Sequence, residues 1–208
     1  MRDQCGLATQ LARVDMSPEP WSHGYTQTCM PGEFAGRLSE SFPLIQMKPG
    51  ERREGGKTYR FRTARLGVDG AGPPDGAWAE LMSALRSTAY RDAMSRLTGI
   101  ALAEAGCEVN AWEYLPGDWL SPHVDKERKL VTQIFYLTRH WHDGDGGRLV
   151  ILDRDARNVA RFLPPLLGSS AVVVRSPDSW HAVEESAPAS QPRRSLTITF
   201  TKPAGGSC

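Results

Sequence analysis

Pro122-His123-Val124-Asp125 is the stretch around which the rest of this sequence can be arranged. Residues two apart on an extended backbone point to the same face of a sheet, so His123 and Asp125 can reach one metal ion from a single strand end. A second histidine, His181, follows a Pro-Asp-Ser-Trp turn further along the chain. Two imidazoles and one carboxylate are the ligand set of non-haem iron(II) sites with open coordination positions. We therefore expect these three residues to bind one iron ion, although His-x-Asp alone also occurs by chance on solvated surfaces.

A second informative stretch is Pro192-Arg193-Arg194-Ser195-Leu196-Thr197-Ile198-Thr199-Phe200, near the C-terminus. Strand alternation places Arg193, Ser195, Thr197 and Thr199 on one face, and Arg194, Leu196, Ile198 and Phe200 on the other. The second face is apolar after its first residue and belongs to a core, whereas the first is polar and suits a pocket wall. A guanidinium on that wall can bind a carboxylate through two parallel hydrogen bonds. The alternation therefore favours Arg193 over Arg194 as an anion-binding residue.

The fold class follows from a change of pattern along the chain. Apolar residues at helical spacing predict helices over residues 31–38, 78–85 and 90–97. From residue 100 onward, short extended runs alternate with Gly-, Pro- and Asp-rich turns, a pattern typical of a β-sandwich or barrel. The runs cover residues 100–103, 107–114, 129–138, 147–153, 170–175, 181–184 and 193–201. We predict an α+β, mainly β fold whose N-terminal helices pack on one face of the β core.

The whole chain, residues 1–208, reads as one domain. We expect a loosely ordered arm over residues 1–20, a helical lead-in over 21–99, the β core over 100–201 and a tail over 202–208. Residues 48–56 are charged and glycine-rich and are expected to form a loop. The sequence leaves open whether the region 48–74 closes over a substrate.

Composition narrows the classes of partner. The chain has 208 residues, 40% of them hydrophobic and 24% charged, and its net charge of +1 gives no global attraction for nucleic acid or an anionic membrane. Its four widely spaced cysteines argue against a zinc ribbon or disulfide framework and favour the cytoplasm. We expect no signal peptide and no transmembrane helix. The sequence leaves open whether the protein forms a homodimer.

Six motifs, in order, carry a resemblance to a known family. They are Tyr114-Leu115-Pro116-Gly117, His123-Val124-Asp125, Ile134-Phe135-Tyr136-Leu137, Gly146-Gly147-Arg148-Leu149, His181 and Arg193-Arg194-Ser195. With them the chain resembles the Fe(II)/2-oxoglutarate-dependent dioxygenases, in particular their prolyl-4-hydroxylase-like branch. The resemblance implies a double-stranded β-helix (jelly-roll, cupin-like) core, iron held by His123, Asp125 and His181, and 2-oxoglutarate held by Arg193.

The resemblance also assigns residues around the cosubstrate and the substrate. It implies that Tyr136 donates a hydrogen bond to the distal carboxylate of 2-oxoglutarate and that Tyr114 is a second tyrosine of that pocket. Ser195 and Thr197 share the face of Arg193 and are further candidates for cosubstrate binding. Candidate substrate-pocket residues are Asn110 and Trp112, which share a strand face with Tyr114, and Trp180, which precedes His181.

The reaction implied is hydroxylation, or a related oxidation, of an unactivated C–H bond with O2 as oxidant and release of succinate and CO2. Ascorbate is a candidate reductant. Because Asp125 fills the position that the family's halogenases leave small, hydroxylation is favoured over halogenation. The peptide-binding region of prolyl hydroxylases is not recognisable in residues 48–74, which favours a small molecule such as an amino acid or natural-product intermediate. Alternatives are modification of a protein residue, a cupin-like metalloprotein that does not use 2-oxoglutarate, and a non-catalytic jelly-roll module.

Overall fold

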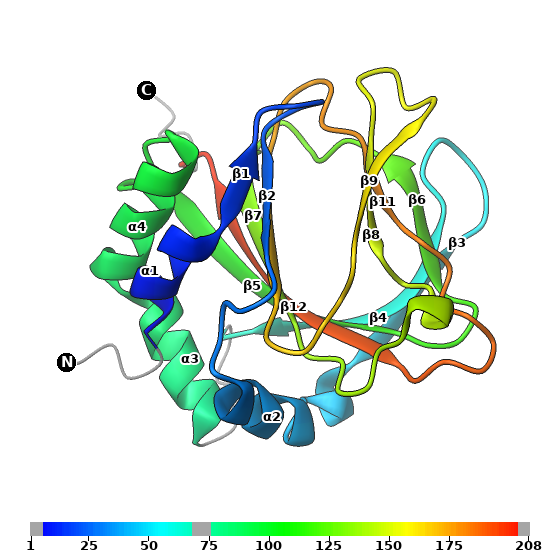
Figure 1. Cartoon of the computed structure of the whole chain (residues 1–208), viewed down its shortest axis with the longest axis horizontal. Coiled ribbons are helices and arrows are strands. Elements are labelled where there is room, and N and C mark those ends of the chain that lie inside the picture. The colour runs from blue at the N-terminus through cyan, green and yellow to red at the C-terminus, as the bar shows by residue number, and fades with distance from the viewer. Residues whose placement is uncertain (1–5, 68–75, 204–208) are drawn as a thin grey trace.

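The computed structural model describes residues 6–67 and 76–203, and within this part twelve strands form one antiparallel sheet (Figure 1). The strands are β1 (Asp15–Ser17), β2 (His23–Thr26), β3 (Lys48–Arg52), β4 (Tyr59–Leu66), β5 (Gly106–Tyr114), β6 (Trp119–His123), β7 (Lys129–Tyr136), β8 (Leu149–Leu152), β9 (Val159–Leu163), β10 (Ser170–Val174), β11 (His181–Val183) and β12 (Arg193–Thr201). The helices are α1 (Leu7–Gln10), α2 (Gly32–Glu40), α3 (Ala77–Arg86) and α4 (Thr88–Thr98), with 3-10 turns η1 (Leu11–Arg13), η2 (Leu44–Gln46) and η3 (Asp143–Asp145).

The sheet rolls up because one strand belongs to two walls. Its order is β1-β2-β10-β7-β12-β5-β4-β6-β11-β8-β9, and β3 pairs with the outer edge of β4. Residues 62–66 of β4 pair with β5, whereas Tyr59 and Arg60 pair with β6. The wall β6-β11-β8-β9 therefore continues from the wall β5-β12-β7-β10-β2 and lies on the side away from the helices (Figure 1). The result is a jelly-roll (double-stranded β-helix) core, as the sequence predicted.

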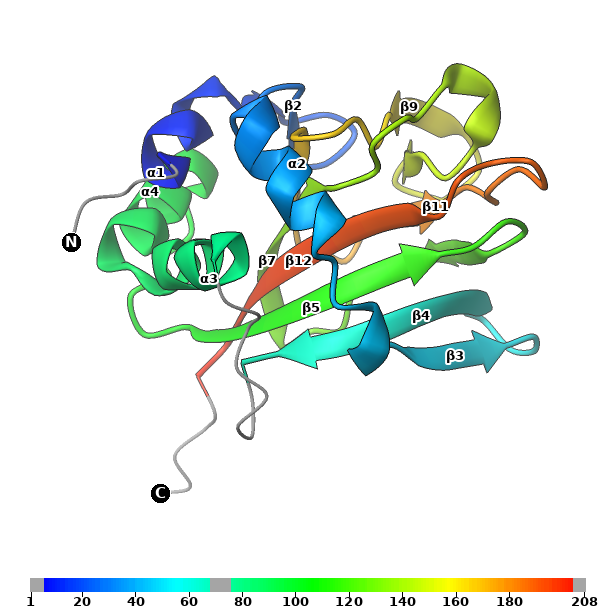
Figure 2. The ribbon, with the colours of Figure 1, turned by 90° about the horizontal axis from the view of Figure 1, so that it is seen from below.

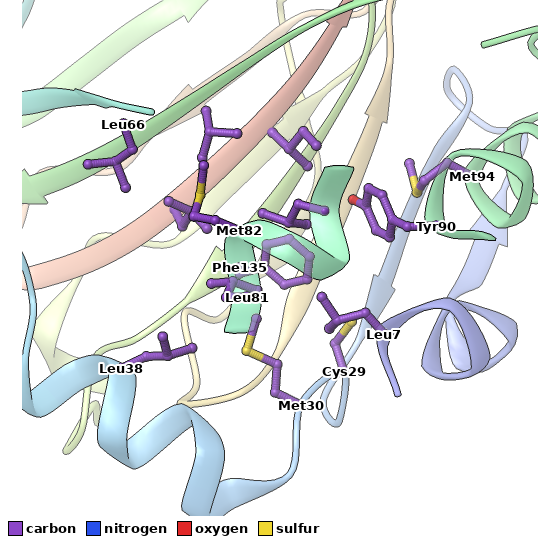
Figure 3. Packing of buried hydrophobic residues seen from close by; sticks show 14 of the residues in the cluster. Leu7, Cys29, Met30, Leu38, Leu66, Leu81, Met82, Tyr90, Met94 and Phe135 are labelled. Atoms are coloured by element: carbon purple, nitrogen blue, oxygen red, sulfur yellow. The ribbon is translucent and has the colours of Figure 1, made fainter. Parts of the chain in front are cut away.

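The helices pack on the outer face of the larger wall, as expected (Figure 2). Residues of α3 and α4, such as Leu81 and Tyr90, share one buried cluster with Phe135 of β7 (Figure 3). Ile198 and Phe200 of β12 belong to the same cluster. Ser87 caps the N-terminus of α4 by accepting a hydrogen bond from the Tyr90 backbone N–H at 3.1 Å. Gly99, at φ 71°, ends the same helix in the left-handed conformation that favours glycine.

The helices expected over 31–38, 78–85 and 90–97 are confirmed as α2, α3 and α4. The strand expected over 100–103 is wrong, because this segment lies against α4 instead of beside a strand. The Arg91 guanidinium donates hydrogen bonds of 2.6 Å to the backbone oxygens of Leu102 and Ala105. None of the helices in residues 6–67 and 76–203 is long and apolar enough to cross a membrane.

The expectation of a loosely ordered arm over residues 1–20 is wrong for residues 6–20, and residues 1–5 lie outside the described part. Leu7, Leu11 and Val14 are buried in the main core, and β1 pairs with β2. These apolar side chains stand four and three residues apart, which is the spacing of one helix face. The short segment therefore stays ordered by burying its apolar face under α4 (Figure 1).

The loop expected over residues 48–56 is also partly wrong, since Lys48–Arg52 forms β3 and pairs with β4. Gly50 allows the Phe61 ring of β4 to lie close to the β3 backbone, because a Cβ at this position would be only 3.2 Å from that ring. The following strand, β4, spans Tyr59–Leu66, and residues 68–74 lie outside the described part.

The buried N-terminal segment gives a test of the fold. Leu11→Ala should lower the free energy of unfolding by about 2–5 kcal/mol, because it leaves a cavity beside α4. Thr9→Ala, at an exposed position of α1, should change it by less than about 0.5 kcal/mol. Urea denaturation followed by circular dichroism measures both variants. Equal stability of Leu11→Ala and the unmodified protein would contradict the packed N-terminal segment.

Candidate metal centre

The site is built on the pairing of two short strands, β6 and β11. His123, the last residue of β6, lies opposite His181, the first residue of β11, and the imidazole centroids are 4.4 Å apart. Asp125 follows β6 by two residues, and its Oδ1 lies 3.9 Å from His123 Nε2. One nitrogen or oxygen atom from each of the three side chains lies within 4.8 Å of the other two. The sheet thus brings together the three residues that the sequence singled out as metal ligands.

Backbone hydrogen bonds fix both imidazoles in the state that a metal ion needs. His123 Nδ1 lies 3.0 Å from the backbone oxygen of Ser121, and His181 Nδ1 lies 2.9 Å from that of Ser179. A carbonyl oxygen only accepts hydrogen bonds, so each Nδ1 carries the proton and each Nε2 keeps its lone pair. Burial lowers the pKa of His181, and burial together with the neighbouring His181 lowers the pKa of His123. Both imidazoles are therefore neutral at neutral pH, and each can offer its Nε2 lone pair to a metal ion.

Asp125 supplies the negative charge of the site. Burial alone would raise the pKa of its carboxyl, but the nearby His181 and the Lys129 ammonium, which donates to Oδ1 at 2.7 Å, lower that pKa overall. The carboxylate is consequently ionised. Two neutral imidazoles and one carboxylate on one side of a cavity fit an iron(II) ion with open coordination positions.

Arg193 forms a second binding element in the same cavity. It is the first residue of β12 and pairs with Tyr114 of β5. Its guanidinium carbon lies 4.9 Å from the ring centroid of Tyr114 and 5.2 Å from that of Tyr136. Nε donates to the Gly147 backbone oxygen at 2.7 Å, and Nη1 donates to Ser195 Oγ at 3.0 Å. These contacts hold the guanidinium in place and leave N–H groups available to a ligand.

Tyr136 contributes a buried hydroxyl beside Arg193. Its oxygen has no hydrogen-bond partner among the residues that the structure describes, which is uncommon for a buried polar atom. Burial raises the pKa of Tyr136, and it raises that of Tyr114 to about 12. Both phenols therefore stay protonated and can donate. An unpartnered donor beside a guanidinium fits a carboxylate ligand.

A cavity of about 420 Å³ joins the two elements. The residues that line it include the three candidate metal ligands, Arg193, Asn110, Trp112, Tyr114, Ser195, Thr197 and Thr199. The last strand therefore turns its polar face to the cavity and its apolar face to the core. Tyr136 is buried beside Arg193 and shares a face of β7 with Thr132 and Ile134, which line the cavity.

Of the three predicted substrate-pocket residues, Trp180 is the one that does not line the cavity. It packs against Val150, Leu152 and Ala182. Because adjacent residues of an extended segment point to opposite faces, the inward direction of His181 turns Trp180 outward. The assignment of Trp180 to the substrate pocket is therefore wrong.

Three residues near the metal ligands were not predicted as parts of the site. Trp21 contacts His181 with ring centroids 6.2 Å apart, and its indole N–H donates to the Leu152 backbone oxygen at 3.0 Å. Lys57 and Lys129 line the cavity. Lys129 reaches Asp125 from four residues further along the chain, whereas only the pairing of β4 with β6 shows that Lys57 reaches the metal end.

The depressed histidine pKa values predict how metal affinity depends on pH. An imidazole with the ordinary pKa of 6.5 would be about three-quarters protonated at pH 6.0. His123, whose pKa burial lowers to about 2, should still be neutral there, and the lowered pKa of His181 keeps it less protonated than an ordinary imidazole. Mn(II) affinity should therefore fall by less than about fourfold between pH 7.5 and 6.0. Calorimetry in two buffers of different ionisation enthalpy measures the affinity and the protons released. A fall of about tenfold, with proton release at pH 6.0, would show that the histidines titrate normally.

Comparison with known proteins agrees with this geometry. The family model described as the 2OG-Fe(II) oxygenase superfamily matches residues 109–201. No curated protein sequence matches the chain. A prolyl-4-hydroxylase from Pseudomonas putida superposes with a TM-score of 0.68 at 20% identity, over 95% of this chain and 97% of the other. A 2OG-Fe(II) oxygenase-family oxidoreductase from Burkholderia pseudomallei gives 0.61 at 19%, over 95% and 92%. A Trichoplax adhaerens prolyl hydroxylase, solved with a peptide fragment of the hypoxia inducible factor oxygen degradation domain, gives 0.63 at 15%, over 94% and 87%.

These structures share the jelly-roll fold of this chain, and the family model covers the segment that carries the site. All three candidate metal ligands and Arg193 fall within that segment. The superfamily is named for 2-oxoglutarate and Fe(II), the cosubstrate and the metal that the donor set and Arg193 fit. Residues 109–201, which include the candidate metal ligands and Arg193, thus match the 2OG-Fe(II) oxygenase superfamily.

Proposed function

We propose that this enzyme hydroxylates an unactivated C–H bond of a small molecule, with Fe(II) at His123, Asp125 and His181 and 2-oxoglutarate at Arg193. One observation carries the proposal: the metal triad and a guanidinium flanked by two tyrosines face the same cavity. An isomerase-type cupin or a binding module would have no use for the second element. When bound, the iron would activate O2, which is the oxidant, and 2-oxoglutarate would supply two electrons as it is converted to succinate and CO2.

The protein's own residues would bind and orient 2-oxoglutarate and the metal ion, and they exclude water from the site. The remaining N–H groups of Arg193 and the hydroxyl of Tyr136 would hold the far carboxylate of 2-oxoglutarate by charge-assisted hydrogen bonds. The rings of Tyr114 and Tyr136 cover the guanidinium and limit its contact with water. The Nδ1 hydrogen bonds of the two histidines keep each Nε2 directed at the metal.

The cavity supports a small-molecule substrate. Its volume of about 420 Å³ is at the lower end of the range for small-molecule sites and has to hold 2-oxoglutarate as well. A second candidate, modification of a prolyl residue in a polypeptide, is favoured by the prolyl hydroxylases among the similar structures, one of which was solved with a peptide. A screen of amino acids, their derivatives and proline-containing peptides for stimulation of succinate release separates the two.

The oxygenase chemistry can be tested without knowing the substrate. Anaerobic addition of Fe(II) and 2-oxoglutarate to the metal-free protein should produce a weak visible charge-transfer band, because the cosubstrate chelates iron. Arg193→Ala should weaken or abolish the band while Fe(II) still binds, since Arg193 is not a metal ligand. Iron binding without a band in the unmodified protein would favour a cupin-like metalloprotein, and no iron binding would overturn the metal site.

Tyr136→Phe tests the cosubstrate site more finely. Losing a hydrogen bond to a charged group costs about 1.5–3 kcal/mol, so 2-oxoglutarate affinity should fall by about 10- to 100-fold. The free energy of unfolding should not fall, because this hydroxyl has no partner among the described residues.

Tyr90→Phe is the matched control. The Tyr90 hydroxyl is also buried, but it donates to Gln133 Oε1 at 2.6 Å behind the sheet. Its removal should destabilise the protein by about 1–3 kcal/mol and leave 2-oxoglutarate affinity unchanged. Titration of Mn(II)-loaded protein and urea denaturation give the two readouts. If both variants lost stability and neither lost affinity, Tyr136 would have only a structural role.

A further inference from the structure

Lys57 is held at the metal end of the cavity by the strand that follows it. The Thr58 backbone N–H donates to Ser121 Oγ at 2.8 Å, and the Ser121 N–H donates to the Thr58 oxygen at 2.9 Å. The Trp119 indole N–H donates to Thr58 Oγ1 at 3.2 Å. Ser121 also accepts the Nδ1–H of His123 through its backbone oxygen. Lys57 thus directly precedes Thr58, which is hydrogen-bonded to β6, the strand that carries the candidate metal ligand His123.

The other charged residues of the cavity are committed to known partners or to water. Five cations and two carboxylates line it: Lys57, Lys126, Arg128, Lys129, Arg193, Glu108 and Asp125. Arg128 donates to both oxygens of Glu108, at 2.8 and 3.2 Å, and Lys129 pairs with Asp125. Arg193 is assigned to the cosubstrate and Lys126 is exposed to solvent.

Lys57 differs from all of these cations. It is partly buried, and no described carboxylate lies within ion-pair distance of its ammonium group. Burial lowers the pKa of Lys57 to about 8, and the Asp125 carboxylate, which raises that pKa, does not offset the loss of water. In the metal-loaded site Asp125 would be shared with the metal ion and with Lys129. The two negative charges of 2-oxoglutarate balance the two positive charges of a divalent metal ion, and the charge of Asp125 is already outweighed by those of Arg193 and Lys129. The charge of Lys57 is therefore not balanced in the loaded site. A partly desolvated cation that faces a ligand cavity is a binding site for an anionic group.

We propose that the substrate carries a carboxylate group and that Lys57 binds it, which makes Lys57 a specificity-determining residue. This inference rests on the proposed function, because it places the substrate beside the metal in the same cavity. The rest of the wall suits a molecule with both polar and apolar parts. Its polar residues are Thr63, Asn110, Thr132, Thr197 and Thr199, and its apolar residues include Trp112, Leu120, Ile134, Leu149 and Val183. The carboxylate could belong to a free acid or to an acidic residue of a peptide.

Matched acid and amide probes test the proposal. Protein loaded anaerobically with Mn(II) and 2-oxoglutarate is titrated with N-acetyl amino acids and with the corresponding N-acetyl amino acid amides, and binding is followed by ligand-observed NMR. Blocked pentapeptides with a central Glu or Gln form a second set. The same titrations are made on Lys57→Gln, on Lys57→Arg and on Lys48→Gln, which removes an exposed charge from β3 outside the cavity.

We expect at least one acid to bind about tenfold more tightly than its amide. Lys57→Gln should abolish that preference, whereas Lys57→Arg and Lys48→Gln should keep it. Preference within the first set identifies a free acid as the source, and preference within the peptide set identifies an acidic residue. The affinity for 2-oxoglutarate should be the same in Lys57→Gln as in the unmodified protein.

Three results would overturn the inference: no acid preference in the unmodified protein, an equal preference in Lys57→Gln, or a loss of 2-oxoglutarate affinity in Lys57→Gln. The last result would assign Lys57 to the cosubstrate. If the unmodified protein failed to bind 2-oxoglutarate at all, the proposed function itself would fail. The affinity of the unmodified protein for the cosubstrate therefore separates the two failures.

Discussion

The antiparallel pairing of β6 with β11 is the constraint on which the site depends. It sets His123 opposite His181, and the two-residue step beyond the end of β6 brings in Asp125. Short strands rarely hold a buried pair of imidazoles by themselves, because desolvating them costs free energy. Here the backbone oxygens of Ser121 and Ser179 meet that cost by accepting the Nδ1 protons. The same bonds choose the tautomer, so the local fold and the donor chemistry have one cause.

Sequence patterns with a period of 2 residues for strands and 3.6 residues for helices predicted the elements of this fold that bury one face. The alternation in β12 correctly separated the cavity face from the core face, and helical spacing located α2, α3 and α4. Elements that are ordered only by contacts with other segments of the chain were not predicted. β3 is polar and exposed and exists because it pairs with β4, and the N-terminal segment is ordered because α4 covers it. No local sequence pattern reports such partners.

In the candidate site, too, some residues could be predicted from the sequence and others could not. The metal triad and Arg193 could be predicted because their residue types and strand positions are specific to one chemistry. The rings on both sides of Arg193 could be anticipated only through family resemblance, and the outward direction of Trp180 followed from alternation once the direction of His181 was known. Lys57 could not be assigned, because a lysine in a cationic segment is usually solvated. Its position depends on hydrogen bonds to Ser121, sixty-four residues downstream in the chain.

The double membership of β4 has a consequence for how the molecule comes apart. Because β4 pairs with β5 along one part and with β6 along another, the wall that carries the histidines can separate from the wall that supports the helices only by losing its pairing with β4. That strand is itself anchored in the main core, where Ala64 and Leu66 are buried. The apolar packing beneath α3 and α4 thus contributes, through β4, to the rigidity of the ligand geometry.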